Sequence, residues 1–214
     1  MRYRTYIFDL DGTLLDNSRS IMTALRKVIT GAGLPLPSDQ ELRAFIGPPI
    51  IDSFMNVCKV DREGAEELFR SYRSVYTMEG TVVNPGVDRL LPWLKEHGAK
   101  LTVASLKLHD SAVSNLREMK IEQYFDAIVG INYKDINTKE ETMEISMQKV
   151  GENDKSQVVM LGDTRFDALG AKNVGVDFVA LIYGGAGFAP GEAEQYAPSF
   201  IARSGEELFR YFTE

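Results

Sequence analysis

Five short apolar runs, rich in β-branched side chains, recur along the chain of 214 residues. They do not alternate with polar residues, which is typical of parallel strands that are covered on both faces. Helical patterns lie between most of them. The sequence therefore predicts an α/β fold with a doubly wound, Rossmann-like parallel sheet. The expected strands are residues 6–8, 101–104, 127–129, 158–161 and 178–182.

Helix signals support this alternation of strands and helices. An apolar stripe over residues 90–94 stops before Gly98, a common helix end. Capping-box spacing at Thr138 predicts a helix that runs to about residue 151. The same spacing at Ser204 predicts a final helix.

One long interval separates the first strand from the second. Between Asp9 and the strand at 101–104 the periodicity is helical, and the turn signal Asn-Pro-Gly at 84–86 resembles the exit from a separate unit. We therefore expect a small α-helical cap domain at 15–84, inserted into a core made of the remaining residues. The alternative is that these helices extend one larger domain. The expected core comprises residues 1–14 and 85–214, and the helical stripes cover 21–28, 50–54 and 65–76.

Charge and composition exclude several classes of protein. Lys and Arg number 24 against 31 Asp and Glu, which gives a net charge of −7. An acidic surface repels phosphate backbones, so nucleic acid is not an expected partner, although one local site can still bind a small anion. A single cysteine and two histidines leave no cysteine-based or histidine-rich metal centre. Any hard metal must therefore be held by carboxylates.

Hydrophobic runs are too short for a membrane span or for the apolar part of a signal peptide. We accordingly expect no membrane partner and a cytoplasmic location. The number of copies stays open, as a monomer or a homodimer.

Two aspartates directly follow the first predicted strand. Residues i and i+2 of a strand point to the same face, so Asp9 and Asp11 can both address the crevice where α/β sheets bind ligands. Two such close negative charges favour a cation between them, and Mg²⁺ prefers oxygen ligands. Gly12 then lets backbone N–H groups approach an anion. The simpler alternative is a strand end that is closed by an Asx turn.

The run Asp-Leu-Asp-Gly-Thr-Leu at 9–14 resembles motif one of the haloacid dehalogenase superfamily. The other family motifs follow in order along essentially the whole chain. Ser105 resembles motif two, with Lys107 two residues later, and Lys139 resembles motif three, with Lys134 as its rival. The segment Gly-Asp-Thr-Arg-Phe-Asp at 162–167 resembles motif four.

The resemblance is strongest to the C1-capped subgroup that includes phosphoglycolate phosphatase and bacterial 5′-nucleotidases. It implies a Mg²⁺-dependent phosphatase that hydrolyses a small-metabolite phosphate monoester through an aspartyl-phosphate. Asp9 would be the nucleophile and Asp11 the acid and base. The implied phosphate ligands are Gly12, Thr13, Ser105 and Lys139. The implied metal ligands are Asp9, the backbone carbonyl of Asp11, Asp163 and, nearby or through water, Asp167. The implied substrate contacts are Gly47 and Pro48 of the cap, with Lys107 of the core.

Other readings of the motifs stay open. A phosphomutase of the β-phosphoglucomutase type would return the phosphoryl group to a sugar, and a non-catalytic binding protein would keep only the fold. A dehalogenase is disfavoured because that branch needs neither a metal nor Asp11 as acid and base. The glycine-rich segment 184–187 lacks the spacing of a dinucleotide-binding loop, so a turn at the rim of the site is expected there. No pattern identifies which phosphate ester is the substrate.

Overall fold

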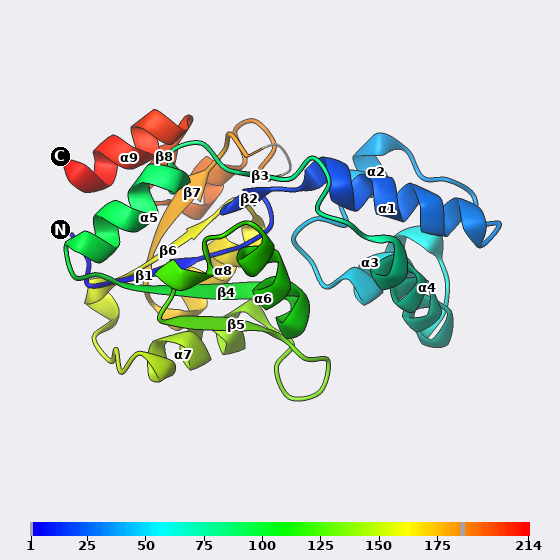
Figure 1. Cartoon of the computed structure of the whole chain (residues 1–214), viewed down its shortest axis with the longest axis horizontal. Coiled ribbons are helices and arrows are strands. Elements are labelled where there is room, and N and C mark those ends of the chain that lie inside the picture. Colours follow the sequence, from blue (N-terminus) through cyan, green and yellow to red (C-terminus); the bar gives the residue numbers. More distant parts are fainter. Residues whose placement is uncertain (1, 185–186) are drawn as a thin grey trace.

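Strand β1 lies inside a six-stranded sheet in which every neighbouring pair is parallel. The computed structural model describes residues 2–184 and 187–214 (Figure 1). All five predicted strands are present within a residue or two of their expected starts. The strands are β1 (Thr5–Phe8), β4 (Lys100–Leu108), β5 (Ala127–Ile131), β6 (Val158–Gly162), β7 (Asp177–Leu181) and β8 (Phe200–Ala202).

The strand order β5-β4-β1-β6-β7-β8 confirms the doubly wound fold that the sequence predicts. Counting only these six strands along the chain, the order is 3-2-1-4-5-6. The order reverses between β1 and β6, and ligands bind at the carboxyl ends of the strands there. The sixth strand, β8, was not predicted, because three residues, two of them only partly buried, carry too little hydrophobic pattern.

Helices cover both faces of the sheet. Helices α5 (Val87–Glu96), α6 (His109–Glu118) and α9 (Gly205–Thr213) share one apolar cluster with the sheet. Helices α7 (Lys139–Lys149) and α8 (Arg165–Val174) share another on the opposite face. The expected capping box opens α7, where Thr138 and Glu141 hold each other's backbone N–H. Among the described residues, no helix is long and apolar enough to cross a membrane.

Four more helices form a body beside the sheet, opposite both chain termini (Figure 1). They share an apolar cluster of their own, which includes Leu25, Phe54 and Leu68. The short helix α2 was not predicted from the sequence. The expected cap boundaries at 15 and 84 stay a prediction. The helices are α1 (Ser18–Gly31), α2 (Asp39–Arg43), α3 (Ile50–Cys58) and α4 (Arg62–Val75).

A two-stranded antiparallel ribbon, β2 (Leu15–Asp16) with β3 (Val82–Val83), joins this body to the core. The hydroxyls of Ser20 and Thr81 lie 3.1 Å apart beside it, so both connecting segments are tied together. Three 3₁₀ turns complete the described chain. They are η1 (Glu122–Tyr124), η2 (Lys155–Gln157) and η3 (Ala193–Tyr196).

Candidate active site

The predicted site residues converge at the carboxyl end of the sheet, where the strand order reverses. Asp9 follows β1 and Asp163 follows β6, its parallel neighbour. Ser105 comes from β4 on the other side of β1, and it is buried. The sequence predicts that this strand ends at residue 104. In the structure β4 instead continues to Leu108, and its register with β5 is irregular between Ser105 and Leu108. A cavity of about 300 Å³ opens between this edge and the helical body.

Lys139 is the centre of a buried ion-pair group. Its Nζ lies 2.5 Å from Oδ1 of Asp9 and 2.7 Å from Oδ1 of Asp167, and it also donates to the carbonyl of Ala104. Burial alone would lower the pKa of Lys139, but the carboxylates of Asp167 and Asp9 raise it above its usual value, so the ammonium stays charged. The two carboxylates also offset the unfavourable position of a cation at the start of α7. The rival, Lys134, is exposed and is not at the site.

Asp163 has one oxygen in use and one without a partner. Its Oδ1 accepts a hydrogen bond of 2.8 Å from the Thr13 hydroxyl, while its Oδ2 is buried and unpartnered. Burial, together with repulsion from Asp167 and Asp9, raises the pKa of Asp163 well above its ordinary value. A buried oxygen without a partner is costly, which indicates that a ligand belongs there.

The donor set around Asp163 fits a divalent cation. Asp9, Asp163 and Asp167 each offer an oxygen, and these oxygens lie within 4.8 Å of one another. Burial raises the pKa of Asp9 to about 7, although the Lys139 cation opposes this shift. A hard cation would offset the repulsion among the three groups and would use the unpartnered oxygen of Asp163. The carboxylate of Asp11 lies outside this cluster.

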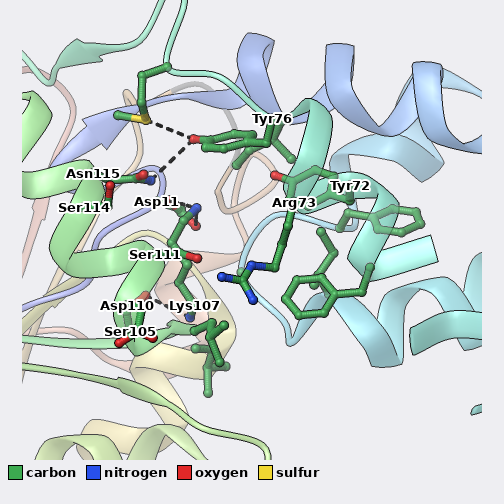
Figure 2. Close-up of a pocket in the computed structure, with 18 of the residues that line it drawn as sticks. Asp11, Tyr72, Arg73, Tyr76, Ser105, Lys107, Asp110, Ser111, Ser114 and Asn115 are labelled. Carbon is green, nitrogen blue, oxygen red and sulfur yellow. Dashed lines mark hydrogen bonds and ion pairs between the residues drawn. The ribbon is translucent and has the colours of Figure 1, made fainter. Parts of the chain in front are cut away.

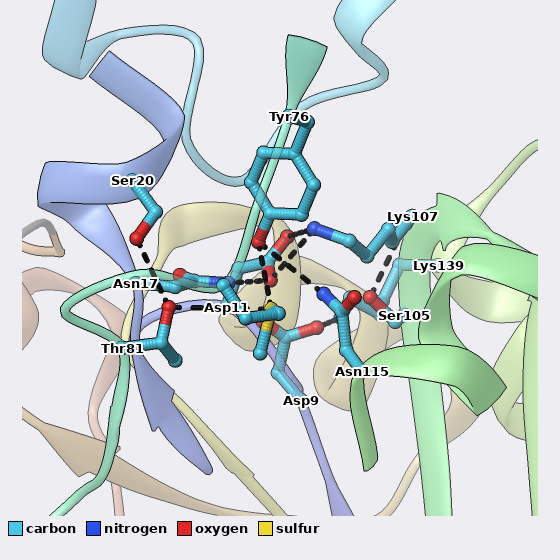
Figure 3. A network of polar contacts seen from close by, with 11 residues as sticks. Asp9, Asp11, Asn17, Ser20, Tyr76, Thr81, Ser105, Lys107, Asn115 and Lys139 are labelled. Atoms are coloured by element: carbon cyan, nitrogen blue, oxygen red, sulfur yellow. Dashed lines mark hydrogen bonds and ion pairs between the residues drawn. The ribbon is translucent and has the colours of Figure 1, made fainter. Parts of the chain in front are cut away.

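Asp11 is held by two side chains that the sequence does not connect to it. Nζ of Lys107 lies 3.1 and 3.0 Å from its two oxygens, and Nδ2 of Asn17 lies 2.6 Å from Oδ1 (Figure 3). The Lys107 ammonium also lies over the ring of Tyr76, 5.1 Å from its centroid. Burial alone would lower the pKa of Lys107, but the Asp11 carboxylate raises it. Asn17 was missed because nothing near position 17 resembles a motif.

Gly12 and Thr13, for which the resemblance implies a role as phosphate ligands, make hydrogen bonds within the protein, and that role stays a prediction. The backbone N–H of Gly12 donates to the carbonyl of Leu15 at 2.8 Å, and the Thr13 hydroxyl is used by Asp163. Neither residue is among the described residues that line the cavity. Gly12 has a φ of +88°, and a Cβ built there would lie 2.1 Å from Oδ2 of Asp163. The glycine therefore leaves space for the carboxylate.

The helical body contributes the loop that the sequence predicts and also a wall that it does not. Gly47 and Pro48 line the cavity, and a Cβ on Gly47 would lie 3.0 Å from Cγ2 of Thr164, next to Asp163. Helix α4 supplies an aromatic and cationic wall that has no motif. Figure 2 shows Tyr72, Arg73 and Tyr76 on this wall, facing α6.

The glycine-rich segment after β7 lies against both aspartate-bearing loops. A Cβ on Gly184 would lie 2.0 Å from the carbonyl oxygen of Gly12, and one on Gly187 would lie 2.2 Å from that of Asp163. Two residues of the expected rim turn, 185 and 186, lie outside the described part of the chain. The two described glycines leave no room for side chains beside the site.

The motif order and the cluster of carboxylates agree with a comparison of the whole sequence. The model of the family described as haloacid dehalogenase-like hydrolase matches residues 6–181. The chain belongs to the haloacid dehalogenase-like hydrolases. The resemblance noted from the motifs is thereby confirmed.

Relatives whose names state an activity are similar to most of the chain. Pyrophosphatase PpaX of Halalkalibacterium halodurans is 29% identical over 212 residues, or 97% of this chain and 96% of the relative. A 5′-nucleotidase of Pseudomonas aeruginosa is 31% identical over 188 residues (86% and 85%). A phosphoglycolate phosphatase of Pseudomonas savastanoi is 30% identical over 187 residues (83% and 69%).

The fold of this haloacid dehalogenase-like hydrolase has also been solved in a similar chain. A hydrolase of this family from Streptococcus pneumoniae has a TM-score of 0.87 and 28% identity, and the similarity covers 99% of each chain. Together with the family match and the relatives, this agreement confirms the prediction of an enzyme of the phosphatase class.

Proposed function

We propose that this hydrolase is a Mg²⁺-dependent phosphatase that cleaves a small-metabolite phosphate monoester through an aspartyl-phosphate on Asp9. The observation that carries the proposal is the buried cluster of Asp9, Asp163 and Asp167, with an unpartnered oxygen beside the nucleophile. Similarity to a phosphoglycolate phosphatase and to a 5′-nucleotidase supports a phosphate monoester as substrate.

In the first step, a carboxylate oxygen of Asp9 attacks phosphorus, and the bond from phosphorus to the leaving oxygen breaks. For this step Asp11 must enter in its protonated form, and it then donates that proton to the departing alkoxide, since it lines the same cavity as Asp9. Lys107 and Asn17 orient the Asp11 side chain for this transfer. The leaving alcohol then departs through the side of the cavity that α4 and α6 enclose.

In the second step, water attacks the phosphorus of the aspartyl-phosphate and Asp11 takes its proton. This step releases inorganic phosphate and restores the Asp9 carboxylate. Ser105 and Lys139 hydrogen-bond the phosphoryl oxygens, since Ser105 lines the cavity and Lys139 contacts Asp9. Asp9, Asp163, the Asp11 carbonyl and, nearby or through water, Asp167 would hold Mg²⁺, which would supply positive charge that offsets the repulsion between the Asp9 carboxylate and the phosphate.

The proposal is tested with Asp9→Asn, which replaces the attacking oxygen by an amide of similar size. With Mg²⁺ and p-nitrophenyl phosphate, the wild-type protein releases phosphate and forms an acid-stable phosphoenzyme that mass spectrometry detects. Asp9→Asn shows neither, while the matched control Asp88→Asn, on the exposed side of α5, behaves as the wild type. Full activity of Asp9→Asn would exclude the mechanism. Conversion of a sugar phosphate to its isomer without phosphate release would identify a mutase instead.

A further inference from the structure

Arg73 projects from α4 into the cavity that holds Asp9 and Asp11 (Figure 2). Within the described part of the chain, its guanidinium forms no hydrogen bond or ion pair. A guanidinium keeps its charge at every physiological pH and offers a planar set of donors. The cavity therefore contains a fixed positive charge whose donors are free for a ligand.

The other cation that lines the cavity is already occupied. Lys107 binds both oxygens of Asp11. Among the described residues around the cavity, Arg73 is thus the cation that remains for a substrate group away from the reacting phosphate. Its place on α4 puts it on the side of the leaving group, because Asp9 and Asp11 lie at the edge of the sheet.

The wall opposite Arg73 limits the charge of the leaving group. Helix α6 presents the hydroxyls of Ser111 and Ser114, and also the carboxylates of Asp110 and Glu118. One guanidinium neutralises one carboxylate and matches its two oxygens in a bidentate pair. A second phosphate would bring a charge of about −1.5 to −2, which is more than one guanidinium neutralises. The acidic side chains of α6 are exposed, which weakens their effect, but they would repel this larger charge more than they repel a single carboxylate.

We propose that Arg73 determines specificity by binding a carboxylate on the leaving group, so that the preferred substrates are phosphate esters of small hydroxy acids. This inference rests on the proposed phosphatase function and adds the substrate class to it. The phosphate lies at Asp9, the carboxylate pairs with Arg73, and the serine hydroxyls of α6 face the carbon chain between them.

The experiment compares two esters that differ in one group, 2-phosphoglycolate and ethyl phosphate. The wild-type protein is expected to prefer the carboxylate ester. Arg73→Gln should lower kcat/KM for 2-phosphoglycolate about tenfold or more, mainly through KM, because a charged hydrogen-bond pair is lost. Its kcat/KM for ethyl phosphate should stay within about twofold. Arg73→Lys should restore part of the loss, since it keeps the charge without the planar donors.

The matched control is Arg70→Gln, an exposed arginine on the same helix that does not line the cavity. It should leave both esters unchanged. Equal losses on both esters with Arg73→Gln, or no loss on 2-phosphoglycolate, would overturn the proposal. A preference for ethylene glycol bisphosphate that disappears in Arg73→Gln would overturn the carboxylate assignment.

A binding measurement separates this inference from the proposed function. Calorimetry of 2-phosphoglycolate binding is carried out on Asp9→Asn and on Asp9→Asn with Arg73→Gln, in the presence of Mg²⁺. Weaker binding to the double variant supports Arg73 as the carboxylate ligand even if the wild-type protein releases no phosphate from p-nitrophenyl phosphate and forms no phosphoenzyme, a result that would refute the proposed function. Equal affinities would refute the role of Arg73 while leaving the phosphatase assignment intact.

Discussion

Nζ of Lys107 donates hydrogen bonds to both carboxylate oxygens of Asp11, at 3.1 and 3.0 Å, although 96 positions separate the two residues in the chain. The two side chains are only 12% and 15% exposed, so solvent screens their attraction weakly. Lys107 comes from the far end of β4 and Asp11 from the loop after β1, and these two strands are parallel neighbours. The pair fixes the side chain that the proposed mechanism uses to move protons.

Lys107→Met should slow catalysis by removing this constraint on Asp11. Asn17 would remain as the one described partner of that carboxylate, which we expect to rotate away from the leaving oxygen. We predict that kcat for p-nitrophenyl phosphate falls by more than about tenfold, and that stability falls by about 1–3 kcal/mol because a charged hydrogen-bond pair is lost. Lys134→Met, at an exposed lysine outside the site, is the control and should change neither quantity. An unchanged kcat in Lys107→Met would remove Lys107 from the mechanism.

Gly12→Ala should disturb Asp163 more than it disturbs the backbone. The new methyl group would lie 2.1 Å from Oδ2 of Asp163, so the carboxylate must move. Gly33→Ala is a matched control, because Gly33 also has a positive φ, +70°, but has no atom within 4 Å of the added Cβ. Backbone strain should lower the free energy of unfolding by about 1–2 kcal/mol in both variants, as measured by thermal unfolding. Gly12→Ala should lower it further. Equal losses would contradict the close approach of Asp163.

Removal of the divalent ion should abolish turnover and lower stability. The three buried carboxylates carry more negative charge than the single Lys139 ammonium offsets, so they still repel one another without a divalent ion. An ion that binds only the folded state stabilises it by about 2.7 kcal/mol at a hundredfold excess over its Kd. We expect EDTA to stop phosphate release and lower Tm, and excess Mg²⁺ to restore both. In Asp163→Asn the rise of Tm with Mg²⁺ should be much smaller. An enzyme that keeps its activity in EDTA would contradict the assignment.

Glu152, which lies outside the candidate active site, should make the stability of the protein depend on pH. Arg4 and Thr5 donate to its carboxylate, and the Arg4 hydrogen bond is the largest cause of a pKa below the ordinary value of 4.5. The unfolded chain therefore binds this proton more tightly, so the stabilisation is complete above pH 4.5 and is lost as the pH falls through the folded pKa.

Glu152→Gln measures this contribution. At pH 7 the substitution should lower the free energy of unfolding by about 1 kcal/mol, as measured with denaturant. The effect is limited because Arg4 is exposed and solvent screens its interaction with Glu152. The difference from the wild-type protein should shrink as the pH falls below 4.5. Glu67→Gln, at an exposed position on α4, should show no such dependence. If the stability difference between Glu152→Gln and the wild-type protein grew as the pH falls, the predicted pH dependence would be wrong.

Much of the fold was readable from local patterns. Continuous apolar runs predicted the five main strands, since a strand buried on both faces has no polar positions. The capping box at Thr138 predicted the start of α7, because the contacts that open a helix lie within four residues. Strand β8 and helix α2 were missed, because three and five residues are too few to show a period.

By itself, the sequence determined the parallel sheet and the identity of the acidic residues at its edge, because strand periodicity and motif spacing depend on near neighbours along the chain. Only the tertiary structure decided what those residues contact. It placed Lys139 between Asp9 and Asp167, turned the Thr13 hydroxyl to Asp163, paired Lys107 with Asp11, and brought Arg73 to the wall of the cavity. These contacts join residues that are 28 to 150 positions apart, and no local pattern encodes which side chains meet when the strands and helices pack.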